Sequence, residues 1–281
     1  MSKVGRVIIQ YVVVPLACMI AYYLLISISL ETVRAFAGED VMKYDYAIYT
    51  LEGIVGIILC LLWFRAYRKY GFGQIPYSKG KSEDWLLAVF AALAMLGISA
   101  LYFTAINNIH TPYIERSMRE YNEMMEVTSS STLAVALNLL SSCLLIPVLE
   151  EMIFRGVVFQ GMLQVSHPVP AILVSGFCFG VMHGQVIQIG YAFLCGIVLA
   201  VVYYVSKNLV MSIATHMLFN FVGSGIYEVF NPSEVIQYIL EVVEYAAIPI
   251  FIIMVILLIR FKKKQDKKSK MTVPVESKGE Q

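Results

Sequence analysis

Residues 144–156 read LLIPVLEEMIFRG and place two adjacent carboxylates, Glu150 and Glu151, inside an apolar run. A charge near the centre of a lipid-exposed helix costs about 2.5 kcal/mol or more, so these carboxylates are expected to face protein or water. Glu151 precedes Arg155 by one helical turn, which is the favourable order for a helical ion pair. We therefore predict that Glu151 pairs with Arg155 and leaves Glu150 available for chemistry. Pro147 has no N–H and is expected to free a backbone carbonyl one turn earlier.

The composition of the whole chain is that of a membrane protein. Of its 281 residues, 59% are hydrophobic and 15% are charged, whereas soluble domains carry about 25% charged residues. Apolar runs near the length of about 20 residues that a membrane span needs predict an all-α bundle of eight transmembrane helices. The eight runs are 7–30, 46–64, 85–106, 133–159, 169–183, 186–205, 209–222 and 235–261. The fifth and seventh runs are short and contain histidine, so we expect helices that are broken, tilted or shielded from lipid by their neighbours.

The charges between the runs predict the orientation. Residues 65–82 hold five basic residues and no acidic one, whereas 31–45 and 107–132 each hold four acidic and two basic residues. The positive-inside rule then places 65–82 and both termini in the cytoplasm. The first apolar run is longer than the roughly 7–15 residues of a signal peptide core, so it is expected to stay as a span. The six lysines of 262–270 directly follow the last run, which favours contact with anionic lipid over binding to nucleic acid.

No internal repeat is visible, so the chain is interpreted as one membrane domain with four parts. These are 1–132 with the first three spans and an outer loop, 133–230 as the catalytic helical core, 231–262 as the last span, and 263–281 as a basic, disordered cytoplasmic tail. Charged residues at helical spacing in 113–126 predict a surface helix in the outer loop. The five cysteines lie in apolar runs without a C-x-x-C motif, so they predict packing residues and neither disulfides nor a zinc site.

Two further pairs of polar or aromatic residues lie one helical turn apart. Phe179 precedes His183 in the fifth run, and His216 precedes Asn220 in the seventh. Together with Glu150 these side chains are expected to meet in one cavity open to the cytoplasm. A carboxylate assisted by a histidine can take a proton from water, and a histidine with an amide can stabilise an oxyanion. We predict that Glu150 acts with His183 on water, and that His216 acts with Asn220 on the oxyanion.

Other uses of these residues stay open. Glu150, His183 and His216 could hold a zinc ion with one position left for water. The metal-free arrangement is preferred, because Asn220 is a poor zinc ligand but a good amide donor. The polar network could also be a buried anchor without chemistry. A proton relay of a transporter is a third use, although no paired repeat supports it.

The ordered set of three motifs resembles the CPBP family of intramembrane proteases, also called the CAAX protease and bacteriocin-processing (Abi) family. The motifs are E-E-x-x-x-R at 150–155, F-x-x-x-H at 179–183 and H-x-x-x-N at 216–220, within a region of resemblance from 133 to 229. The resemblance implies an eight-helix bundle with a cytoplasm-facing site. It also implies catalytic roles for Glu150, His183, His216 and Asn220, with Glu151, Arg155 and Phe179 in support.

Substrates in this family range from prenylated C-terminal peptides to precursors of bacteriocins and signalling peptides, and other members act in immunity or regulation. We therefore predict an endopeptidase that cleaves membrane-associated peptides or proteins. The alternative is a non-catalytic membrane regulator or bacteriocin self-immunity protein that keeps the polar network as a scaffold. A bacterial plasma membrane suits such a chain, with the endoplasmic reticulum as the other possibility.

The remaining titratable residues have simpler interpretations. His110 and His167 fall between apolar runs and are expected in turns or at the surface. Glu241 and Glu244 open the last run and are expected at the outer interface of the membrane. Glu52, near the start of the second run, is ambiguous.

Overall fold

The computed structural model describes residues 2–38, 41, 44–69, 80–125, 132–226 and 233–272. This described part is all-α, and four of its helical segments are π-helical turns, which are labelled η. The elements are α1 (Lys3–Ile8), η1 (Ile9–Val13), α2 (Val14–Ala37), α3 (Asp45–Lys69), α4 (Ser82–Asn107), α5 (Pro112–Met125), α6 (Thr132–Leu140), η3 (Ser141–Leu145), α7 (Ile146–Glu151), η4 (Met152–Phe159), α8 (Gln160–Leu163), α9 (Pro168–Met182), α10 (Val186–Ser206), α11 (Leu209–Asn220), η5 (Phe221–Gly225) and α13 (Glu234–Thr272).

Six continuous helical stretches in the described residues are long and apolar enough to cross a membrane. They are Lys3–Ala37, Asp45–Ala66, Ser82–Asn107, Thr132–Leu163, Val186–Ser206 and Glu234–Leu257. Two shorter apolar helices, Pro168–Met182 and Leu209–Gly225, complete the set. The predicted all-α, polytopic bundle is therefore confirmed and the chain is an integral membrane protein, although only six of the eight predicted transmembrane helices are long enough to cross a membrane by themselves.

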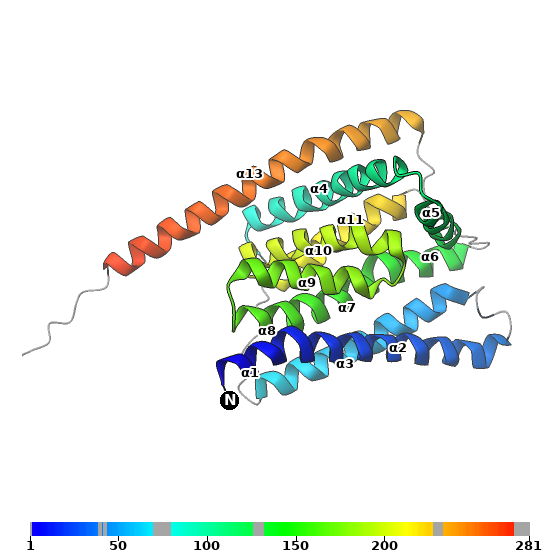
Figure 1. The fold of residues 1–281 in the computed structure, drawn as a ribbon, viewed down its shortest axis with the longest axis horizontal. Coiled ribbons are helices and arrows are strands. Elements are labelled where there is room, and N and C mark those ends of the chain that lie inside the picture. Colours follow the sequence, from blue (N-terminus) through cyan, green and yellow to red (C-terminus); the bar gives the residue numbers. More distant parts are fainter. Residues whose placement is uncertain are drawn as a thin grey trace, which may run out of the picture.

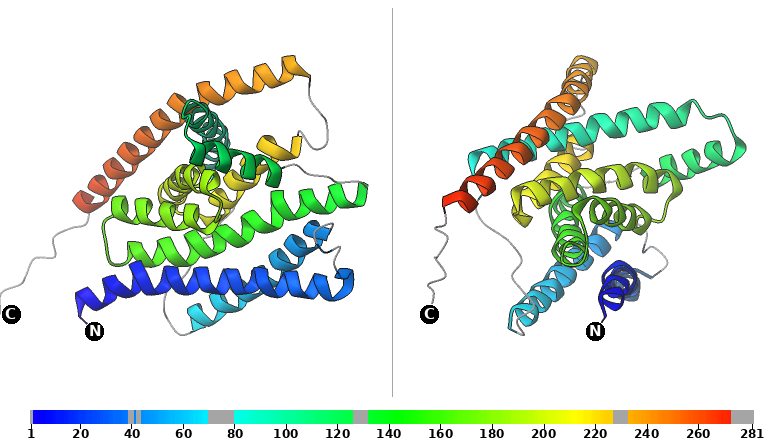
Figure 2. Two further views of the ribbon diagram at one scale, coloured as in Figure 1. Left: turned by 45° about the vertical axis from the view of Figure 1, so that its right-hand side comes forward. Right: turned by 60° about the vertical axis from the view of Figure 1, so that its left-hand side comes forward.

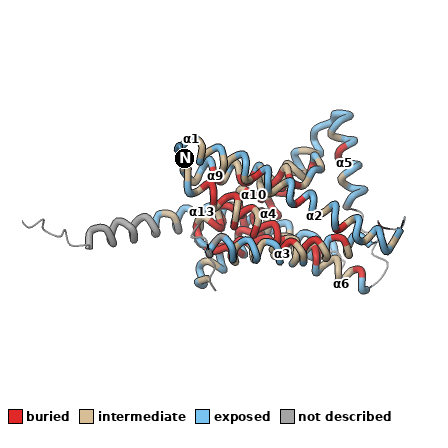
Figure 3. Tube along the Cα trace, turned by 90° about the horizontal axis from the view of Figure 1, so that it is seen from below, coloured by how far each residue is buried: buried red, intermediate tan, exposed pale blue. Residues whose placement is uncertain are grey.

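The helices form three groups across the bundle (Figure 1). α13 and α4 lie on one side, α2 and α3 lie on the other, and α9, α10, α11 and the α6–α8 segment lie between them. Half of the α10 span is buried, but only 11% of the last span is. The buried residues accordingly gather in the middle group and on the neighbouring helix α4 (Figure 3). Polar side chains in a membrane protein can be accommodated in such a shielded interior.

Both ends of the described chain lie at the same end of the bundle, as Figures 1 and 2 show. α5 lies at the opposite end and corresponds to the predicted surface helix of the outer loop. α13 continues to Thr272, so residues 263–272 of the tail predicted to be disordered are helical. Lysine is a good helix former and extends a helix that the membrane span has already nucleated. Residues 273–281 lie outside the described residues.

The two short helices pack inside the bundle. α9 lies against α10 and η4, and α11 lies against α4, α10 and α7. α9 begins at Pro168 and ends before Gly184, whose φ of 73° is left-handed and stops the helix. His183, the histidine of the fifth apolar run, therefore lies at the C-terminal end of α9.

Candidate active site

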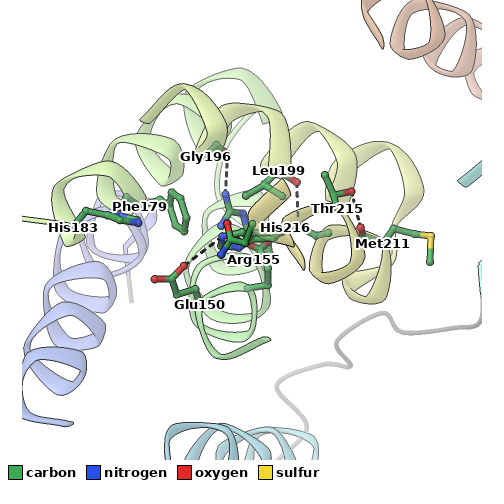
Figure 4. A network of polar contacts seen from close by, with 12 residues as sticks. Glu150, Arg155, Phe179, His183, Gly196, Leu199, Met211, Thr215 and His216 are labelled. Carbon is green, nitrogen blue, oxygen red and sulfur yellow. Dashed lines mark hydrogen bonds and ion pairs between the residues drawn. The ribbon is translucent and has the colours of Figure 1, made fainter. Parts of the chain in front are cut away.

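The predicted ion pair between Glu151 and Arg155 is confirmed and lies at the centre of the site (Figure 4). Arg155 Nη1 donates to Glu151 Oε1 at 2.7 Å, and both side chains are fully buried. Arg155 Nη2 donates to the carbonyl of Gly196 on α10 at 2.9 Å. The guanidinium also lies 4.6 Å from the ring centroid of Phe179 on α9, which is a cation–π distance. One arginine thus joins η4 to α7, α9 and α10.

Glu151 also receives two contacts from α11. Ser212 Oγ donates to Glu151 Oε2, and His216 Nδ1 lies 3.2 Å from Glu151 Oε1. Ser212 was not singled out in the sequence, although it lies one turn before His216 on the same helix face. Both oxygens of Glu151 are engaged by these partners, so this carboxylate holds Arg155, Ser212 and His216 in place.

Glu150 is the carboxylate whose oxygens are less engaged. It is 8% exposed, and its Oε2 lies 3.7 Å from Nε2 of His216, which is 5% exposed. This distance exceeds a direct hydrogen bond, but one water molecule beside the pair could contact both atoms. The hydroxyl of Tyr22 donates to the other oxygen, Oε1, at 3.4 Å. The geometry therefore leaves Glu150 Oε2 as the atom that can act on water.

His216 lies between the two adjacent carboxylates. With a proton on Nδ1 the ring donates to Glu151, and Nε2 is free to accept a proton beside Glu150. When both nitrogens are protonated, the ring can donate to both carboxylates. This arrangement is that of a histidine that moves protons at Nε2 while its second nitrogen is held in place.

His183 lies on the far side of Phe179 from this pair (Figure 4). Its Nδ1 donates to the Phe179 carbonyl at 2.9 Å, and its ring contacts the Phe179 ring edge-on at 5.0 Å. The Phe179 ring also contacts His216 edge-on, at 5.7 Å. Among the described residues no hydrogen bond or ion pair joins His183 to Glu150. The structure therefore brings Glu150 to His216, whereas the sequence had paired it with His183.

Asn220 contacts the helix of Glu150 and not His216. Its Nδ2 donates to the carbonyl of Ser142 at 2.8 Å. In the π-turn η3 the N–H of Ile146 bonds to the carbonyl of residue 141, so the next residue, Pro147, would pair with Ser142. Proline has no N–H, and the asparagine amide satisfies this carbonyl instead. The carbonyl that Pro147 was predicted to free is thus bound by Asn220, whose amide has a second N–H for another acceptor.

The proposed metal set does not come together. In the described part of the chain, no group of three His, Cys, Asp or Glu side chains is arranged to hold a metal ion. Glu150 and His216 are close, but His183 is directed to the backbone of Phe179. These residues do not fit a three-ligand zinc site as they stand.

The other titratable residues lie as expected or add to the site. His110 is exposed between α4 and α5, and His167 caps α9 by accepting from Val169 N. Glu241 is exposed on α13. Glu52, which the sequence left ambiguous, is buried on α3 at 1% exposure.

Phe179 contacts Arg155, His183 and His216, so its loss is expected to weaken the fold. We predict that Phe179→Leu lowers the free energy of unfolding by roughly 1–3 kcal/mol, because the cation–π contact and the edge-on ring contacts disappear. Thermal unfolding of the detergent-solubilised protein measures this. Phe177→Leu, two residues earlier at a position 57% exposed, is the control. Equal decreases in stability for the two variants would contradict the stabilising role given to Phe179.

The fold and the site define a class, that of polytopic membrane proteins with a carboxylate–histidine pair buried between helices. Residues 132–222 match the family model described as type II CAAX prenyl endopeptidase Rce1-like. This segment is therefore an Rce1-like domain of the CAAX protease (CPBP/Abi) family, as the three motifs had indicated. Comparison with curated proteins gave no match, and comparison with solved structures gave none either. The helices α1 to α5 and α13 lie outside the matched segment.

Proposed function

We propose that this protein is an intramembrane endopeptidase that hydrolyses peptide bonds of membrane-associated peptides or proteins. The observation that supports this most is the pair formed by Glu150 Oε2 and His216 Nε2, 3.7 Å apart and nearly buried in a membrane protein. A scaffold needs only the Glu151–Arg155 ion pair. The second carboxylate adds a charge that an anchoring role does not require.

In the proposed reaction a water molecule lies beside Glu150 Oε2 and His216 Nε2. Glu150 accepts a proton from this water as its oxygen bonds to the carbonyl carbon of the scissile peptide. His216 in its protonated form donates to the oxyanion, while Glu151 holds Nδ1. The C–N bond then breaks, and the proton on Glu150 passes to the leaving amine. The free N–H of Asn220 and Nε2 of His183 are candidate contacts for the substrate.

The substrate class to test first follows from the matching family, which is described as a prenyl endopeptidase family. The test uses the full chain in proteoliposomes with three probes: a farnesylated C-terminal CAAX peptide, the same peptide without the lipid, and one with a transmembrane anchor. Mass spectrometry of the products is expected to show cleavage of a membrane-tethered probe and little cleavage of the free one. No cleavage of any probe would favour a non-catalytic regulator or a bacteriocin self-immunity protein.

The proposed mechanism also makes a prediction about metal ions. In the proposed mechanism Glu150 and His216 act on water directly and no metal ion takes part. Chelators such as EDTA and 1,10-phenanthroline are therefore expected to leave kcat unchanged. Cleavage of the tethered probe is measured before and after dialysis against each chelator. A loss of activity that zinc restores would overturn the metal-free mechanism.

A further inference from the structure

We propose that Tyr22 and Glu52 are positioning residues of the active site, acting through the Tyr22 hydroxyl on Glu150. Tyr22 lies on α2 and Glu52 on α3, so both lie outside the segment 132–222 that matches the protease family. This inference rests on the proposed function. It adds an N-terminal helix pair to a site that the three motifs place entirely in the central helices.

The Tyr22 hydroxyl decides which oxygen of Glu150 is available. Tyr22 is 8% exposed, and its hydroxyl donates to Glu150 Oε1. A carboxylate can rotate about its last bond and exchange its two oxygens. A donor on Oε1 holds the group so that Oε2 faces His216 Nε2. The hydroxyl therefore presents one oxygen of the base to water and keeps the other occupied.

Glu52 is the second carboxylate at this hydroxyl. Its side chain lies within hydrogen-bonding reach of the Tyr22 hydroxyl, and it is 1% exposed. Because the hydroxyl gives its one proton to Glu150 Oε1, Glu52 can bond to the Tyr22 oxygen only as a donating, protonated acid. Its other oxygen, Oε2, is buried without a hydrogen-bond partner among the described residues. A buried carboxyl group with an unsatisfied oxygen lowers the stability of the fold, so a role other than stability would account for its presence. Holding the hydroxyl that orients Glu150 is such a role.

Two glycines beside Glu52 allow α3 to approach the helix of Glu150. A Cβ at Gly53 would lie 2.6 Å from Cβ of Leu145, and one at Gly56 would lie 2.5 Å from Cδ2 of Leu149. A larger residue at Gly53 would require the helices to move, because the contact is with the Cβ and backbone of Leu145, whereas at Gly56 the ends of leucine side chains would have to move. Small residues at helix interfaces permit this close contact in membranes. The position of Glu52 near Glu150 is thus a built feature of the α3–α7 interface.

The first test compares two adjacent tyrosines. Tyr22→Phe removes only the hydroxyl that reaches Glu150, and Tyr23→Phe removes a hydroxyl that donates to the Met182 carbonyl at 3.0 Å. On the membrane-tethered peptide that the wild type cleaves, Tyr22→Phe is expected to lower kcat roughly tenfold to hundredfold, because the base is misplaced. KM should stay within about twofold, since no substrate contact is lost. Tyr23→Phe should leave both constants within about twofold of wild type.

The second test asks whether Glu52 acts through the tyrosine. Glu52→Leu is expected to lower kcat as Tyr22→Phe does, whereas Glu52→Gln can still hydrogen-bond the hydroxyl and should restore most of the rate. The double variant Tyr22→Phe/Glu52→Leu should be no slower than Tyr22→Phe alone, because both changes remove one interaction. Unfolding midpoints confirm that each variant is folded.

The outcomes separate the inference from the proposed function. If the wild type cleaves the peptide and Tyr22→Phe behaves like Tyr23→Phe, the positioning role is wrong and the protease function stands. A loss confined to KM, or additive losses in the double variant, would also overturn it. If the wild type cleaves no probe, the proposed function fails, and this inference fails with it.

Discussion

Glu150→Gln is expected to lower kcat for a membrane-tethered peptide by roughly 10²–10⁴-fold, because an amide cannot accept the proton of the attacking water. The fold should survive. Glutamine has the same shape, Glu150 keeps a small exposed area, and the buried arginine pairs with Glu151 instead. The measurement is kcat in proteoliposomes, with the unfolding midpoint in detergent as the check on folding.

Glu241→Gln is the matched control for this variant. Glu241 is exposed on α13, a helix at one side of the bundle (Figure 1), so its neutralisation should leave kcat unchanged. Retained cleavage by a folded Glu150→Gln variant would show that another group acts on water. His183, whose Nε2 makes no hydrogen bond among the described residues, would then be the first candidate.

Arg155→Met should lower the free energy of unfolding by about 3–5 kcal/mol, because it leaves Glu151 as an uncompensated buried charge. The arginine also loses its bond to the Gly196 carbonyl and its contact with the Phe179 ring. Methionine fills much of the volume, so the loss reports the charge and the hydrogen bonds more than a cavity. Thermal or denaturant unfolding of the solubilised protein measures it.

Two further variants sharpen this prediction. The double variant Glu151→Gln/Arg155→Met leaves no buried charge and should recover part of the lost stability. Arg116→Met is the matched control, since Arg116 and Glu120 have the same i, i+4 spacing at 3.5 Å but are largely exposed. An exposed pair contributes about 0–1 kcal/mol. If Arg155→Met costs no more than Arg116→Met, the buried pair does not hold the site together.

The spans could be predicted closely because each depends on one local property. Twenty or so apolar residues in a row leave no alternative to a buried or lipid-facing helix, and charged, polar or glycine residues end each run. The short helix that ends at Gly184 was also visible as a short run. The helical extension through residues 263–272 was missed, because a lysine-rich segment is equally compatible with a disordered tail.

Contacts within one helix could be predicted, and contacts between helices could not. The Glu151–Arg155 pair follows from the period of the helix alone. Whether Glu150 meets His183 or His216 depends on where α9 ends, how Phe179 is placed and how α11 crosses α7. Counting how deep each residue lies along a straight helix gives no information on these three features.

The sequence by itself determined the all-α membrane fold, the three motifs and the ion pair of Glu151 with Arg155, because these depend on hydropathy and on the 3.6-residue period. Only the tertiary structure decided that His216 lies between both carboxylates. It also decided that Asn220 satisfies the carbonyl left by Pro147, and that Tyr22 and Glu52 approach Glu150. These contacts arise where helices distant in sequence pack together. Small residues and π-turns set the distances between those helices, and the hydropathy pattern of a single helix does not predict such distances.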